Sequence, residues 1–389
     1  MANYISSNAN RFYACLEAAY GQAASVTAAN RFPAVRLLAQ QILQPGKRLD
    51  KTGTRTFLGS SKASRRSTAF EARTYLTSWS GSDEPSYGPL FTAALGAGAQ
   101  LSSGLIVAVA ETPTQLQMTA AHGLQLGYAI SYNGDIRFVT SVPDASTIVI
   151  NAPFSTAPGA NSALASAVTY SLATALPSVT LYDYWDPSTA VSRILTGAAV
   201  DRLDISVNGD FHEFTFSGPA ADLIDSSSFV AEAAGLTVFP VEPALTPFDY
   251  SIVPGHLGEV WLGSAANQFF TLTDASIEVR NNIDVRNREF GSSYPQAIAP
   301  GMRQVASTFK LLAQDDAQTS GLYAAAKQRS TIGAMLQLGR QQGQIMGIFL
   351  PNVTPEIPNY DDSETRLQWT FKNNLAKGTA EDELFIAFA

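Results

Sequence analysis

Apolar and polar residues alternate along several stretches of this chain. One such stretch is Leu203–Val207, which is followed by the turn dipeptide Asn208-Gly209 and by a second alternating run that ends at Phe216. Alternation on both sides of a tight turn predicts a β-hairpin with one buried face. Ser276–Arg280 and Leu367–Phe371 alternate in the same way. Strands therefore dominate the prediction.

Helical patterns are few and short. Pro85–Leu95 and Ala317–Lys327 each place their apolar residues on one face of a helix. Asp315 occupies the position of an N-cap, with Gln318 three residues later. A further short helix is predicted at Asn10–Tyr20. The fold class that follows is mainly β with short flanking helices (α+β).

An internal repeat is the most informative feature of the sequence. Phe57–Ser61 is matched by Glu289–Ser293, and both segments contain Gly-Ser-Ser. At the same separation downstream, Leu90–Ala94 is matched by Leu322–Ala326. Two matches at equal spacing predict a tandem duplication, because fixed-period similarity is typical of repeated structural units.

A third match, between Phe214–Phe216 and Trp369–Phe371, breaks the spacing. The excess is explained by an inserted small β-domain, since the Ala-, Ser- and Thr-rich segment after Leu101 has its own strand patterns. The predicted division is an N-terminal arm at 1–30, a first β-sandwich module at 31–100 plus 173–235, the insert at 101–172, a proline-rich linker at 236–250 and a second module at 251–389.

Composition narrows the classes of partner. The net charge is −8, the pI is about 5.0 and only 15% of residues are charged, so a basic surface for nucleic acid is not expected. Cys15 is the single cysteine, which excludes a disulfide framework. The first twenty residues lack an apolar core, and no run approaches the roughly 18 apolar residues of a membrane span. We therefore expect neither a signal peptide nor membrane insertion.

Candidate chemistry is sparse. The three histidines, His122, His212 and His256, lie far apart in sequence without metal-ligand spacing. No Gly-x-Ser-x-Gly elbow and no phosphate-binding loop occurs. The sequence predicts no catalytic residue, no metal site and no cofactor, so an enzyme is not expected.

Three parts of the sequence resemble the major tail tube proteins of long-tailed (siphophage-type) bacteriophages, in their two-domain form. They are Arg193–Asp201 with the following hairpin, Arg286–Arg303, and Leu367–Phe371. The similarity extends over nearly the whole chain beyond Arg31. It implies two tandem tail-tube β-sandwich modules, the first interrupted by the insert, which would decorate the outside of a tube. Strands of neighbouring copies would pair around a central channel.

The resemblance also implies sites and partners. Three copies would form a pseudo-sixfold ring, with a hexameric ring as the alternative, and rings would stack through the loops 44–66 and 280–303. The candidate contact residues in these loops are Gly59, Ser60, Ser61, Phe290, Gly291, Ser292 and Ser293. Glu71 and Glu278 are candidates for an acidic lumen through which DNA passes without specific binding. Other partners would be the tape measure, terminator and distal tail proteins, in a virion assembled in the bacterial cytoplasm.

Two alternatives remain open. One is another virion component, such as a tail terminator, a baseplate hub or a decoration protein. The other is a carbohydrate-binding β-sandwich or a hydrolase that uses Trp79, Trp185, Trp261 or Trp369 as a sugar platform. Self-assembly into long tubes distinguishes the tube protein from both.

Overall fold

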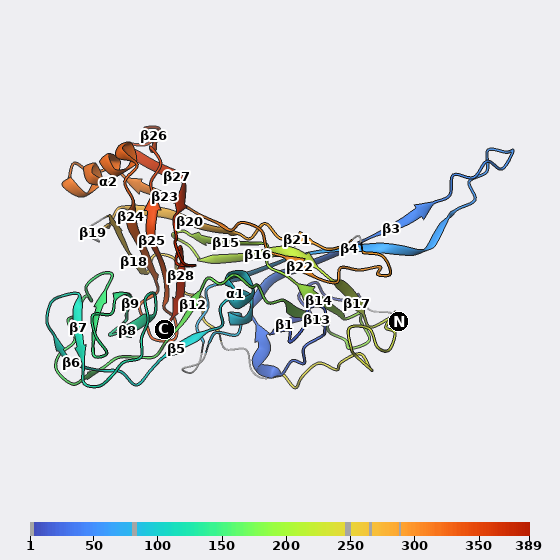
Figure 1. Cartoon of the computed structure of the whole chain (residues 1–389), viewed down its shortest axis with the longest axis horizontal. Coiled ribbons are helices and arrows are strands. Elements are labelled where there is room, and N and C mark those ends of the chain that lie inside the picture. Colours follow the sequence, from blue (N-terminus) through green and yellow to red (C-terminus); the bar gives the residue numbers. More distant parts are fainter. Residues whose placement is uncertain (1–3, 80–83, 246–249, 264–266, 288) are drawn as a thin grey trace.

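The computed structural model describes residues 4–79, 84–245, 250–263, 267–287 and 289–389. These residues form an elongated molecule in which strands predominate and two short α-helices lie beside the sheets (Figure 1). The predicted mainly β class with short helices is confirmed. Within the described ranges, neither helix has the length and apolar character needed to cross a membrane.

One long antiparallel sheet runs through the molecule. Its strands, in spatial order, are β19 (Asn267–Gln268), β18 (Gly258–Gly263), β24 (Ile332–Leu338), β25 (Met346–Thr354), β27 (Gln368–Ala376), β23 (Gln304–Leu312), β20 (Leu272–Arg280), β15 (Arg202–Val207), β16 (Glu213–Ala220), β4 (Ser60–Tyr75) and β3 (Ala34–Lys47). Side branches are β26 (Asn359–Asp361), β28 (Phe385–Phe388), β12 (Ala167–Ser171) and β5 (Gln100–Ser102). Strands from the first half of the chain (up to residue 235) and from the second half (from residue 251) therefore belong to a single sheet.

The predicted hairpin lies at the centre of this sheet. β15 pairs with β16 so that Leu203 faces Phe216 and Ile205 faces Phe214. All four side chains are buried, whereas the residues between them point to the opposite face. The alternating stretches at 276–280 and 367–371 are likewise strands, in β20 and β27. Burial of one face only is what makes such strands readable from sequence.

A second sheet packs against the first half of the long sheet. Its order is β17 (Asp222–Asp225), β14 (Arg193–Ala198), β13 (Val179–Trp185), β1 (Asn10–Leu16) and β2 (Arg31–Phe32). The prediction of a short helix at 10–20 is therefore wrong, because this segment begins with strand β1. β1 is buried on both faces, with Phe12, Tyr13 and Ala14 all inside. A continuous apolar run of this kind does not distinguish a strand from a helix. A short 3-10 helix, Ala28–Asn30, precedes β2.

The segment 101–172 carries a sheet and a core of its own. The strand order is β11 (Ser162–Ala163), β6 (Ile106–Ala110), β7 (Gln115–Met118), β10 (Thr147–Ile150), β9 (Asp135–Ser141) and β8 (Ala129–Tyr132). We call this six-stranded unit the insert sheet. It lies at the end of the molecule opposite the projecting hairpin β3–β4 (Figure 1). β5 and β12, which flank it in the chain, pair with each other, and β12 also pairs with β28 in the long sheet.

The two predicted α-helices are present. α1 (Gly88–Leu95) is buried along its whole length, whereas α2 (Ala317–Gln328) buries only Thr319, Leu322 and Ala326. The N-cap of α2 is Asp316, whose carboxylate accepts a hydrogen bond of 2.6 Å from the Thr319 amide. The prediction of Asp315 was wrong by one residue, because the side chain must stand three residues before the amide that it caps.

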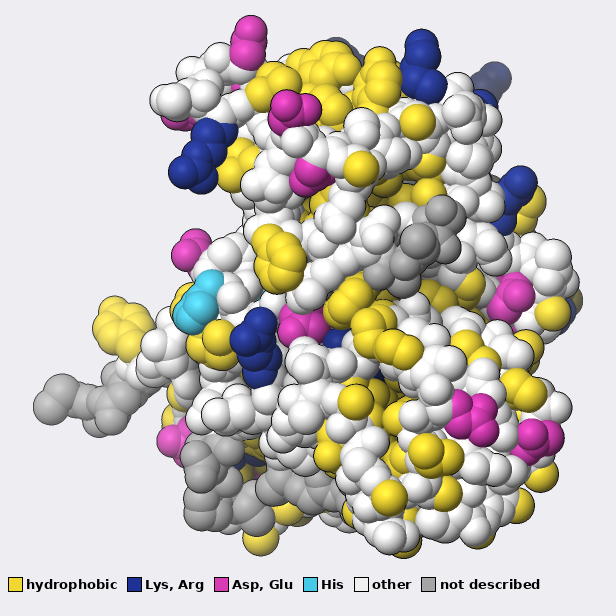
Figure 2. Space-filling view, turned by 90° about the vertical axis from the view of Figure 1, so that its left-hand side faces the viewer, with side chains coloured by type: hydrophobic (Ala, Val, Ile, Leu, Met, Phe, Trp, Pro, Cys, Tyr) yellow, Lys and Arg dark blue, Asp and Glu magenta, His cyan; other side chains and the backbone are white. Residues whose placement is uncertain are grey.

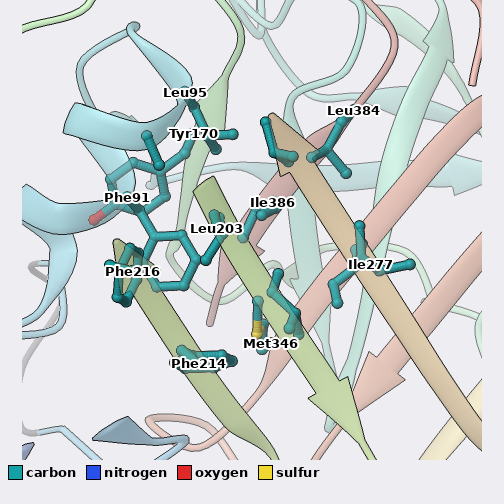
Figure 3. Close-up of a cluster of buried hydrophobic side chains, with 14 of the residues drawn as sticks. Phe91, Leu95, Tyr170, Leu203, Phe214, Phe216, Ile277, Met346, Leu384 and Ile386 are labelled. Atoms are coloured by element: carbon teal, nitrogen blue, oxygen red, sulfur yellow. The ribbon is translucent and has the colours of Figure 1, made fainter. Parts of the chain in front are cut away.

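The two halves share one hydrophobic core. Figure 3 shows Phe91 of α1, Leu203 of β15 and Ile277 of β20 in the same cluster as Met346 and Ile386. The C-terminal strand β28 lies between β12 and β25 and so belongs to both halves. Its Phe388 ring stands 5.2 Å from that of Phe91, edge to face. The halves are therefore joined by packing as well as by strand pairing.

The proline-rich segment between the two halves of the chain packs against the second sheet. Residues 236–245 form no regular strand or helix, but Phe239 and Leu236 pack against the outer face of the second sheet. Glu242 binds Arg11 of β1, at 2.5 Å from Nε. Part of the predicted linker, 246–249, lies outside the described residues. This segment covers a sheet face that would otherwise expose three tyrosines, Tyr13, Tyr182 and Tyr184.

Candidate assembly surfaces

A long hairpin projects from one end of the body. β3 and β4 are joined by the tip 48–59 and extend well beyond the other strands (Figure 1); we call this the hairpin arm. Both ends of the loop predicted at 44–66 are therefore strand, in β3 and β4, and only the tip 48–59 remains a loop; Ser60 and Ser61 begin β4. Gly59 has φ 108°, a value that favours glycine, immediately before the strand. Apolar side chains are exposed on the arm, at Ile42, Leu43, Leu49, Phe57 and Leu58.

The second predicted loop, 280–303, lies along the base of the arm. It contains the small pair β21 (Asp284–Val285) and β22 (Ile298–Ala299). The Ser293 carbonyl accepts a hydrogen bond of 2.7 Å from the Arg66 amide of β4. Phe290, Gly291 and Ser292 are surface residues, and the Phe290 side chain is fully exposed. Residue 288 lies outside the described ranges.

The two Gly-Ser-Ser motifs occupy different places. Gly59 directly precedes β4, whereas β22 separates Gly291 from β23. Their equal distance from the helices is therefore not a residue-by-residue equivalence. The order of elements does repeat: β4 lies between β3 and β16 and precedes α1, and β23 lies between β20 and β27 and precedes α2. The third sequence match, Phe214–Phe216 with Trp369–Phe371, falls on strands in corresponding positions, β16 and β27.

Glu71 and Glu278 lie on the same face of the long sheet. This polar face is turned away from the core on β3, β4, β16, β15, β20 and β23. Ser217 and Arg202 lie between Glu71 and Arg280 in one row across the strands. Its acidic residues are Glu71, Asp204, Glu213, Asp274 and Glu278, and its basic residues are Arg36, Arg65, Arg73, Arg202, Arg280 and Lys310. The two predicted residues thus share a surface on which basic residues are at least as numerous as acidic ones.

Several charges on the polar face are paired, both within a strand and across strands. Arg202 lies 3.2 Å from Glu278 and 2.8 Å from Asp204, and Arg280 also binds Glu278. Burial raises the pKa of Asp204, and the nearby Glu278 carboxylate acts in the same direction. Glu278, Asp204 and Glu213 are thus neutralised by arginines, so this is not the simple acidic surface that Glu71 and Glu278 suggested.

Both ends of this surface are open strand edges. In the described part of the chain, β3 pairs only with β4, and β26 pairs only with β27. Asn359, Tyr360 and Asp361 of β26 are all exposed. Figure 2 looks onto the end that carries α2 and β26 and shows hydrophobic side chains gathered at its upper margin. Sequence reading missed β26, although Pro355 and Pro358 flank its start as expected for an edge strand.

No family model and no curated protein matches this sequence. The resemblance to tail tube proteins therefore stays a prediction from the sequence segments named above. Function is to be inferred from the hairpin arm, the polar face and the two open edges.

The candidate chemical groups do not form a reaction centre. The described residues hold no cluster of three or more His, Cys, Asp or Glu side chains that could bind a metal ion. His122 is bonded to backbone within the insert sheet. His212 and His256 line one pocket, but both ring nitrogens of His212 are buried without a hydrogen-bond partner among the described atoms. Burial lowers the pKa of His212 to about 4, which keeps the ring neutral.

The four tryptophans are half-buried and scattered. Trp79 packs edge to face on Phe388 at 5.5 Å, and Trp369 lies 5.6 Å from Tyr360. Trp261 stacks on the Arg137 guanidinium at 5.3 Å. Trp185 ends β13 on a different sheet. A sugar platform needs exposed aromatic faces near one another. The four tryptophans do not supply such a pair among themselves, and only Trp369 has an exposed aromatic neighbour, Tyr360.

Proposed function

We propose that this protein is a structural virion protein that polymerises into stacked rings and so forms the tail tube of a long-tailed phage, a channel for DNA delivery. The observation that carries the proposal is a continuous antiparallel sheet with one polar face, in which β3 and β26 each pair with a single described strand and leave one edge open. Open edges of this kind invite pairing with another chain. A closed ring removes them.

Two modules in one chain suggest a ring of three copies with pseudo-sixfold symmetry. The repeated order of strands around β4 and β23 supports this count. In that arrangement the polar face lines the channel. A ring of six copies, the alternative, would not require the two modules of one chain to share a continuous sheet.

The hairpin arm supports stacking of rings. Five large apolar side chains are exposed along the arm, whose outer part extends beyond the other described strands. Exposed apolar patches that are larger than those of an ordinary protein surface mark sites of protein association. An arm that projects beyond the body reaches a neighbouring ring rather than its own.

The polar face suits a channel that DNA crosses without adhering. Lys and Arg side chains that are free to bind phosphate release counterions and hold nucleic acid. On this face Arg202 and Arg280 are held by carboxylates, and Arg73 binds Glu213 at 2.5 Å. The net charge of −8 adds repulsion at long range.

Negative-stain electron microscopy of the purified protein tests the proposal. Hollow tubes of uniform diameter are expected. A single ring that does not extend indicates a tail terminator or another virion component instead, and protein that stays monomeric at all concentrations refutes the assembly function. Glycan binding by the isolated protein would support the carbohydrate-binding alternative.

Stacking is tested by removing the apolar tip of the arm. In the double variant Phe57→Ser/Leu58→Ser, both positions are exposed, so the fold is retained, and we expect rings that do not extend into tubes. The matched control is Leu126→Ser, an equally exposed leucine of the insert segment. Normal tubes from the arm variant, or loss of tubes in the control, contradict the role of the arm.

A further inference from the structure

The chain contains its own example of a junction between modules. β15 of the first half pairs with β20 of the second half in antiparallel orientation. Ile205 stands opposite Ile277, and Leu203 stands opposite Val279. All of these side chains are buried. This junction shows how the sheet of one module continues into that of the next.

The two open edges correspond to the two sides of that junction. β15 precedes β16 in the chain and pairs with it, and β26 precedes β27 and pairs with it in the same way. β20 pairs with β23 as β3 pairs with β4. β26 is therefore the counterpart of β15, and β3 is the counterpart of β20, but neither has an outer neighbour in the described chain.

The pairing registers align these counterparts residue by residue. On one side, Ile205 lies opposite Phe214 and Tyr360 lies opposite Trp369, in the two strands that the third sequence match equates.

On the other side, the alignment passes through the strands next to the matched pair. Phe216 faces Ala72 and Phe371 faces Phe309, so Ala72 corresponds to Phe309. Two residues earlier, Phe70 faces Ala39 and Ser307 faces Ile277. Ala39 is thus the counterpart of Ile277.

Burial at the β26 edge is incomplete. Ile205 is 0% exposed, whereas its counterpart Tyr360 is 56% exposed. Phe214 is fully buried, whereas Trp369 is only half-buried and its indole nitrogen finds no hydrogen-bond acceptor among the described residues. The edge has the side chains of a core position without the neighbouring strand that would cover them.

We infer that β26 of one copy pairs in antiparallel orientation with β3 of a second copy, with Tyr360 opposite Ala39 of that copy. The inference rests on the proposed ring and specifies its subunit junction. In this register Asp361 approaches Arg36 of the second copy, within the reach of diagonal cross-strand pairs. Arg36 is exposed and forms no ion pair with any described residue, so the charges of the two edges are complementary.

Disulfide trapping tests the register. The background variant Cys15→Ala removes the only native thiol. In the double variant Ala39→Cys/Tyr360→Cys, opposed residues of an antiparallel pair have Cα atoms about 4.5–5.5 Å apart, within the roughly 4.4–6.8 Å that a disulfide requires. Oxidation of assembled protein is expected to give linked dimers and trimers on a denaturing gel, with nothing larger.

Two controls fix the meaning of the result. Leu38→Cys/Tyr360→Cys shifts one position by a residue, which turns its side chain to the other face, and should give at least tenfold less product. Asp204→Cys/Glu278→Cys places thiols across the internal junction and should cross-link within each monomer.

The outcomes separate this inference from the proposal on which it rests. Tubes that form normally but yield no Ala39–Tyr360 product, or equal product from the shifted pair, overturn the register and leave the tube function standing. Absence of any assembly overturns both. A ladder that continues to six chains supports the junction and overturns the ring of three.

Discussion

Replacement of Arg137 by methionine is expected to loosen the insert sheet from the second half of the chain. Arg137 lies in β9 with its side chain fully buried. Its guanidinium binds the Glu259 carboxylate at 3.1 Å and lies 3.6 Å from that of Asp135. It also donates a hydrogen bond of 2.8 Å to the Gln337 side-chain oxygen. Glu259 belongs to β18 and Gln337 to β24, so one side chain joins two sheets.

The magnitude follows from what the substitution leaves behind. Methionine fills much of the volume, but Glu259 and Asp135 would remain buried without their main counter-ion. Removing one partner of a buried ion pair costs about 3–5 kcal/mol. Arg340 lies 3.7 Å from Glu259 and is exposed, so we expect a loss near ~3 kcal/mol, the lower end of that range. That is a large part of the ~5–15 kcal/mol by which a domain is stable.

Equilibrium unfolding in urea measures the effect. Trp261 stacks on Arg137, so its fluorescence reports the junction, while circular dichroism reports all strands. The double variant Arg137→Met/Glu259→Gln is the matched control. It also removes the uncompensated charge of Glu259, so it should recover part of the lost unfolding free energy. A single variant whose unfolding free energy stays within about 1 kcal/mol of the parent would refute this reasoning.

Two further predictions concern protonation and the channel. Burial holds the pKa of His212 at about 4, below its ordinary 6.5, so folding favours the neutral ring, and the stability that it contributes above pH 6.5 is lost as pH falls towards 4. His212→Leu should therefore flatten the pH dependence of urea unfolding by up to about 3 kcal/mol across that window; an unchanged profile argues against a buried neutral ring. In virions that carry Glu71→Lys together with Glu278→Lys, dye-detected DNA ejection should be slower than in virions with the reversal Glu111→Lys in the insert segment. Equal ejection rates in the two kinds of virion would show that Glu71 and Glu278 do not line the channel.

The strands that sequence reading predicted are those in which one face is buried. Leu203–Val207 and Glu213–Phe216 alternate because one side meets the core and the other meets water. Strand β1 was misread because both of its faces are covered. The outer part of the hairpin arm was misread for the opposite reason: both faces of Leu43–Lys47 are exposed, so no alternation is imposed on that segment.

The candidate surface was predictable only one strand at a time. Alternation in Ser276–Arg280 indicated that Glu278 points away from a core, whereas Glu71 was a candidate from the resemblance alone. Their presence on one face, and the pairing of Glu278 with Arg202, depend on the register between strands that are far apart in the chain. The equal spacing of the Gly-Ser-Ser motifs was misleading in detail, because a shorter strand and a longer loop compensate each other in the second half.

In the proposed assembly, the presence of two modules in one chain changes how a ring forms. In the proposed trimer half of the module junctions are the internal contact between β15 and β20, which exists before assembly begins. Only the junctions between β26 and β3 then cost the translational and rotational freedom of separate subunits. The covalent link also allows the halves to differ, and they do: the hairpin arm and the insert sheet belong to the first half only. A ring of three would therefore present three arms at alternate positions, so that neighbouring rings could dock in three equivalent orientations rather than six.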